Sequence, residues 1–79
     1  MSPFNELDVV ELVEDLPSEG LVAGQRGTIH AVQRAKVTNY LVEFTDEEGT
    51  TLALLPVSED KLALIWEFRT RRFVTTQDK

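Results

Sequence analysis

The stretch NYLVEFTDEEGTTLALLP, residues 39–56, decides the fold class. From Tyr40 onward, alternate residues of NYLVEF (tyrosine, valine and phenylalanine) would share one face of an extended chain, which is the period of a half-buried β-strand. The polar TDEEG segment follows, and Gly49 suits the positive φ angle of a hairpin turn. TTLALLP then provides a partner strand with Leu52 and Leu54 on one face. The stretch therefore predicts an antiparallel β-hairpin in an all-β domain.

Three further segments have the same short, β-prone character. They are LDVVELV (7–13), GTIHAVQ (27–33) and KLALIWEF (61–68). A long connection with Pro17 and Gly20 follows the first of them, and SED can form one helical turn before the last. Five strands in this layout predict a small five-stranded SH3-like barrel over residues 1–66, with a basic C-terminal tail over residues 67–79. The alternative is an amphipathic helix over residues 58–73, and the β-branched and aromatic residues there argue mildly against it.

The segment GQRG, bounded by Gly24 and Gly27, could be a phosphate-binding or RNA-binding loop, or a tight turn. A phosphate loop needs a lysine and a serine or threonine after the glycines, and a dinucleotide fingerprint needs a third glycine and a helix. The glycine loop of KH domains is nearer in spacing, but it joins two helices, whereas TIHAV favours a strand. We interpret GQRG as a turn into a strand, similar to the glycine-containing entry of KOW-type strands, because Gly27 is followed by the apolar residues Ile29 and Val32.

Charge is distributed unevenly along the chain. The 79 residues carry a net charge of −6 and no cysteine, so neither a disulfide nor a zinc–thiolate site is possible. Residues 1–60 contain twelve acidic and three basic residues, whereas residues 61–79 contain five basic and two acidic ones. An acidic body disfavours nucleic acid and favours a cationic protein partner. We see neither a signal peptide nor a membrane span, and we expect a cytoplasmic location and no cofactor.

Two groups of residues are candidates for binding a protein partner. Glu14, Asp15 and Glu19 lie in the long connection and could form an acidic rim, although ordinary solvated loop residues are the alternative. The aromatic residues Tyr40, Trp66 and Phe68 are candidate anchors, because interface hot spots are enriched in large aromatic side chains.

The C-terminal segment WEFRTRRFV, residues 66–74, alternates aromatic and basic residues. Such a mixture can stack on bases and neutralise phosphate, so a KOW-like nucleic-acid or ribosome-binding domain is the second hypothesis. The candidate nucleic-acid contacts are Arg26, Arg69, Arg71 and Arg72. A strand that extends beyond the barrel could instead pair with a second copy of the chain or fold back over the acidic body.

Enzymatic residues are scarce. His30 is the single histidine and has no nucleophile close to it in sequence, so we expect an ordinary strand residue and no enzyme. The acids Asp46, Glu47 and Glu48 lack the spaced oxygen ligands of a calcium loop and are typical of a solvated hairpin tip.

Several segments together resemble a known family. DVVEL, EDLPSEGL, GQRGTI and VEFTDEEGTTLALLPV are similar to small bacterial proteins of the domain of unknown function 4926, over about residues 6–65. The resemblance implies an SH3-like barrel without a catalytic set. Some members lie beside toxin-like genes, so it also implies an antitoxin-like or immunity-like role as an expectation. The segment from Trp66 onward departs from the family pattern.

Overall fold

The computed structural model describes residues 3–74 of the chain. The strands are β1 (Val9–Leu12), β2 (Arg26–Gln33), β3 (Asn39–Thr45), β4 (Thr51–Ser58), β5 (Leu62–Glu67) and β6 (Arg72–Phe73), with two 3-10 helices, η1 (Pro17–Glu19) and η2 (Glu59–Lys61). These residues contain no α-helix, so the all-β prediction is confirmed and the helix considered for residues 58–73 is replaced by η2, β5 and β6. The boundary expected after residue 66 falls inside β5, and residues 75–79 of the expected tail lie outside the described residues.

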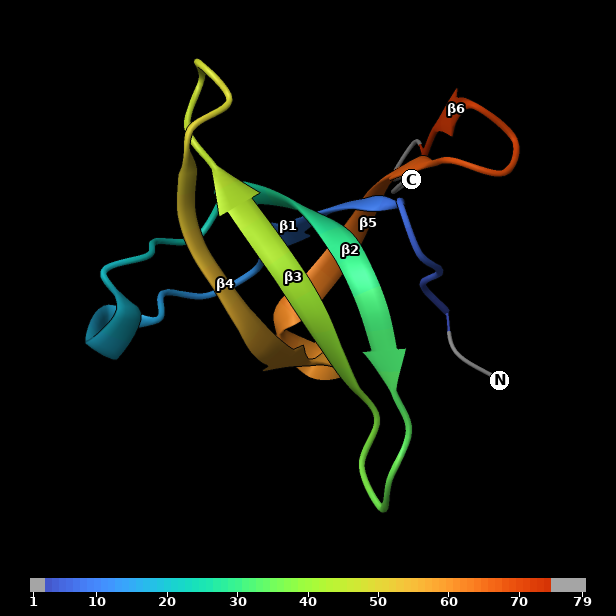
Figure 1. Ribbon diagram of the computed structural model, residues 1–79, viewed down its shortest axis with the longest axis horizontal. Helices are drawn as coiled ribbons and strands as arrows, with labels where there is room; N and C mark the ends of the chain where they lie inside the picture. Colours follow the sequence, from blue (N-terminus) through green and yellow to red (C-terminus); the bar gives the residue numbers. More distant parts are fainter. Residues whose placement is uncertain (1–2, 75–79) are drawn as a thin grey trace, which may run out of the picture.

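All six strands belong to one antiparallel sheet in the order β4-β3-β2-β1-β5-β6. The expected five-stranded barrel therefore needs two corrections. A sixth strand is present, and the sheet is not closed, because β5 pairs with β1 on one side and with β6 on the other. Figure 1 shows how the sheet bends, with β1 and β5 passing behind β2 and β3.

The bend encloses a single hydrophobic core. Its buried members come from the N-terminal segment, the loop after β1 and all strands except β6: Phe4, Val10, Leu12, Leu21, Ile29, Tyr40, Val42, Phe44, Val57 and Leu62. In β3, buried residues alternate with half-buried ones, as the sequence period predicts. The core residues of β3 thus belong to the same cluster as those of β1 and β5.

The two glycines of GQRG have different structural roles. Gly24 adopts a φ of 93°, a left-handed conformation that strains other residues. Gly27 is buried in β2 opposite Phe44, and a β-carbon there would lie 2.6 Å from Val42 Cγ1 and 2.8 Å from the Glu43 carbonyl oxygen. The segment is a bend that leads into a strand, and β2 and β3 can approach because residue 27 has no side chain.

A buried carboxylate joins the segment before β1 to the segment after β5. Asp8 is 2% exposed, and its carboxylate accepts hydrogen bonds from the backbone N–H groups of Asn5 (2.8 Å) and Phe68 (3.0 Å). Its own carbonyl accepts the N–H of Ile29 (2.9 Å) in β2. Asp8 therefore ties the N-terminal segment to the turn between β5 and β6.

Candidate interaction surface

The tip of the β3–β4 hairpin is braced by one of its own acids. Asp46 Oδ1 accepts hydrogen bonds from the backbone N–H groups of Glu48 and Thr50, each at 2.9 Å, and Gly49 takes a φ of 88°. Glu47 and Glu48 are exposed and form no ion pair with any residue of the described range 3–74. The tip therefore presents two uncompensated negative charges on a fixed turn. Within the same range, no three acidic or histidine side chains are grouped to hold a metal ion.

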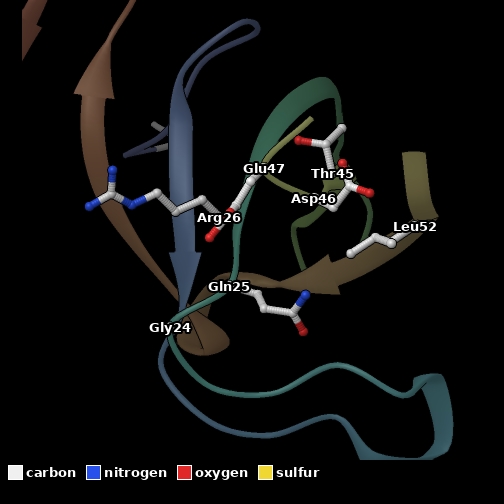
Figure 2. Close-up of a pocket in the computed structure, with 7 residues that line it drawn as sticks. All are labelled: Gly24, Gln25, Arg26, Thr45, Asp46, Glu47 and Leu52. Carbon is white, nitrogen blue, oxygen red and sulfur yellow. The ribbon is translucent and has the colours of Figure 1, made fainter. Parts of the chain in front are cut away.

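A shallow pocket lies between this tip and the bend before β2 (Figure 2). Its lining comprises Gly24, Gln25, Arg26, Thr45, Asp46, Glu47 and Leu52. Leu52 points toward Gln25 across the pocket, while Arg26 points away from Leu52 and lies 3.7 Å from a Glu11 carboxylate oxygen. The pocket thus combines an apolar wall with acidic side chains.

The strand after the tip also exposes apolar side chains. Leu52 and Leu54 of β4 are 49% and 51% exposed. The β3–β4 register shifts between Phe44 and Thr45, which leaves Leu52 without a partner residue in β3 and marks a β-bulge there. Leu54 lies opposite Glu43, whereas Leu52 lines the pocket, so β4 has one exposed leucine at the pocket and a second one farther along the strand.

The acidic rim predicted in the long connection is largely used inside the chain. Glu14 Oε2 lies 3.0 Å from Lys61 Nζ, and this hydrogen bond and charge raise the pKa of Lys61. Asp15 Oδ1 accepts the backbone N–H of Ala23 (2.8 Å), so it braces the connection. Glu19 is exposed in η1. The Glu14–Lys61 contact could not be predicted from local sequence patterns, because the two residues are 47 positions apart.

The three candidate aromatic anchors occupy two different environments. Tyr40 is fully buried, with its ring 5.1 Å from the ring of Phe4 in an edge-on arrangement, so it is a core residue and offers no surface to a partner. Trp66 packs edge-on against Phe68 (6.2 Å) and Phe73 (6.5 Å) in the β5–β6 hairpin. Of this cluster, Phe73 is the most exposed at 73%.

The candidate arginines gather in part at the same hairpin. The Arg71 guanidinium lies 4.7 Å from the centre of the Phe68 ring, and its Nε donates a hydrogen bond to the Phe68 carbonyl (3.1 Å). Arg69 lines a shallow hollow that Arg34 also lines, and Arg72 lies opposite Glu67 in the β5–β6 pair. Arg26 is separate from this group and pairs with Glu11.

The profile of a family described as "Domain of unknown function (DUF4926)" matches residues 6–64. The chain belongs to this family. No curated protein and no solved structure matches the sequence. In residues 3–74 of this DUF4926 chain, no helix has the length and apolar character needed to span a membrane.

The family match covers one of the two candidate surfaces of the DUF4926 chain and not the other. It includes the β3–β4 hairpin, the pocket and all of β4, and it ends two residues before Trp66. The aromatic and basic hairpin after Trp66 therefore lies outside the matched residues.

A polar cluster on the sheet of the DUF4926 chain links three strands. His30 Nε2 of β2 lies 2.9 Å from Glu43 Oε1 of β3, and the Thr51 hydroxyl of β4 donates a hydrogen bond to the other Glu43 oxygen. The hydrogen bond from Thr51, followed by that from His30, lowers the pKa of Glu43 below its ordinary value. The Glu43 carboxylate thus joins β2, β3 and β4 through hydrogen bonds to side chains on both sides of its own strand.

We expect Thr51→Ala to raise the pKa of Glu43 toward its ordinary value, because the hydroxyl is the largest cause of the lowering. A carboxylate whose pKa is lower in the folded state than in the unfolded state stabilises the fold at pH values above its unfolded-state pKa. This stabilisation is lost as the pH falls through the folded-state pKa. The stabilities of wild type and variant should therefore differ at neutral pH and converge in acid. Side-chain NMR titration of Glu43 measures the pKa directly. The matched control is Thr50→Ala, and an unchanged Glu43 pKa in Thr51→Ala would contradict the assignment.

Proposed function

We propose that this domain is a non-enzymatic protein-interaction module that binds a cationic protein at the β3–β4 hairpin. The observation that carries the proposal is the pairing of uncompensated Glu47 and Glu48 with the exposed Leu52 beside the pocket. An exposed apolar patch beside like charges suits a partner with apolar and basic residues, since charge complementarity sets partner choice and speeds association.

The most concrete form of this function is an antitoxin-like or immunity-like role, in which the acidic domain covers a basic surface of a toxic enzyme. The acidic balance of residues 1–60 supports it, because such a body is attracted to the basic surface that nucleic-acid enzymes need.

We also propose that the domain is related to SH3-like domains. The strand order β5-β1-β2-β3-β4, the long connection after β1 and the 3-10 turn before β5 support it. Many interaction modules use a small β scaffold whose loops carry the binding residues.

The second candidate is a nucleic-acid-binding domain that uses the β5–β6 hairpin. The arginine over Phe68, together with the exposed Phe73, favours it, because aromatic rings and guanidinium groups stack on unpaired bases. The net charge of −6 argues against it.

The test compares wild type with Glu47→Lys/Glu48→Lys as bait for partners in a cell lysate at low and moderate salt. We expect a stoichiometric, lysine- and arginine-rich protein that wild type retains and the double variant loses by at least about tenfold. Glu6→Lys/Glu19→Lys is the matched control, because it changes the charge equally at exposed positions elsewhere.

Equal retention of the partner by the hairpin variant would contradict the proposal. Recovery of nucleic acid alone, lost in Arg69→Ala/Arg72→Ala, would support the second candidate instead.

A further inference from the structure

The longest free edge of the sheet is β4. It pairs with β3 on one side, and within residues 3–74 no strand pairs with it on the other. The opposite edge, β6, is two residues long, whereas β4 has eight. A free edge presents unpaired N–H and C=O groups that can pair with another chain.

Pro56 indicates which backbone groups of β4 face outward. Proline has no N–H, so in a paired strand its nitrogen is tolerated on the side away from the partner. Successive residues alternate between the two sides, and the β3–β4 register is regular from Ala53 to Ser58. The N–H and C=O groups of Leu54 therefore face the free edge, beside its exposed side chain.

Both ends of this edge are acidic. Glu47 and Glu48 precede β4, and η2, which carries Glu59 and Asp60, follows it. A hollow lined by Val37, Thr38, Ser58, Glu59 and Asp60 lies at the second end, as the Leu52 pocket lies at the first. The cation of η2, Lys61, is already paired with Glu14.

This distribution of charge disfavours a second copy of the chain as the occupant. Two β4 strands paired in either direction would place acids next to acids at both ends, which is destabilising and is a known protection against edge-to-edge pairing. The complementary occupant has an apolar middle and basic ends.

We propose that the partner adds an extended segment to the free edge of β4 as a further strand, with basic residues flanking a short alternating apolar stretch. The inference rests on the proposed function and specifies how that surface is used. Backbone hydrogen bonds to Leu54, contacts with the side chains of Leu52 and Leu54, and ion pairs at the two acidic ends would hold the segment. Eight strand residues span about 27 Å, so the basic ends should be separated by a comparable length.

Three synthetic peptides test this with the full chain. The first has alternating threonine and valine between two pairs of lysines, the second is the same peptide N-methylated at every threonine and valine so that neither edge can donate hydrogen bonds, and the third is an oligolysine of equal charge. Binding is followed by NMR, with hydrogen exchange of the Leu54 amide as the site-specific readout. We expect the first peptide to bind and protect this amide, and the N-methylated peptide to bind at least about tenfold more weakly because its edge cannot pair.

Leu54→Pro is the matched variant. It removes one outward N–H group, as Pro56 does two residues along the strand, so the variant should retain the fold. Its binding of the first peptide should be weaker by a similar factor. Equal binding of all three peptides would overturn strand addition and leave the acidic surface of the proposed function intact. Failure of all three would overturn strand addition and count against the cationic partner. If the Leu54 amide becomes protected from exchange as the protein concentration rises, with no peptide present, a second copy of the chain occupies the edge and the proposal is overturned.

Discussion

Gly27→Ala is expected to lower the free energy of unfolding by about 3 kcal/mol, because the new methyl group would overlap atoms of β3. The nearest atoms include the backbone carbonyl oxygen of Glu43 at 2.8 Å, which cannot move without breaking the β2–β3 pairing. A domain of 79 residues has a total stability of roughly 4–12 kcal/mol, so this loss is a large fraction of it. Urea unfolding followed by tryptophan fluorescence measures the change.

The control for this experiment is Gly49→Ala at the hairpin tip. A β-carbon there meets no atom within 4 Å, but the φ of 88° strains a residue that has one. The expected cost is about 1 kcal/mol. A Gly27→Ala variant that is no less stable than Gly49→Ala would contradict the close approach of the two strands.

Asp8→Ala is expected to cost about 3 kcal/mol, because it removes a buried carboxylate that accepts two partly buried backbone hydrogen bonds. The affected groups are those of Asn5 and Phe68, which the carboxylate now joins. Asp8→Asn keeps one acceptor oxygen and should lose about half as much. The amide of Phe68 should also exchange faster, which reports the release of the β5–β6 turn separately from global unfolding.

Asp15→Ala is the matched control for Asp8. Asp15 also accepts a backbone N–H, that of Ala23, but the bond is exposed to solvent. Water can replace the lost acceptor there, so the expected cost is under about 1 kcal/mol. Equal losses for Asp8→Ala and Asp15→Ala would show that the burial of Asp8 contributes nothing.

The sequence predicts the hairpin that carries the candidate site but not the site itself. The polar TDEEG segment with Gly49 is sufficient to predict a solvated hairpin turn, whereas the residues predicted to bind a partner lie elsewhere in the chain. The apolar and acidic pocket was not predicted, because it also requires Gln25 from the bend before β2. Asp8 was missed as well, since nothing in LDVVELV distinguishes a buried carboxylate from an exposed one.

The sequence by itself determined the all-β class, the β3–β4 hairpin and the need for glycine at position 49. These features depend on the two-residue period of a strand and on φ angles, which are properties of neighbouring residues. Only the tertiary structure decided that Tyr40 lies in the core, that Glu14 is paired with Lys61, and that the sheet stays open. Those outcomes depend on which distant segments meet: the Asp8–Phe68 hydrogen bond, for example, joins residues 60 positions apart. Local periodicity carries no information about such contacts, because they arise when the whole sheet bends around a shared core.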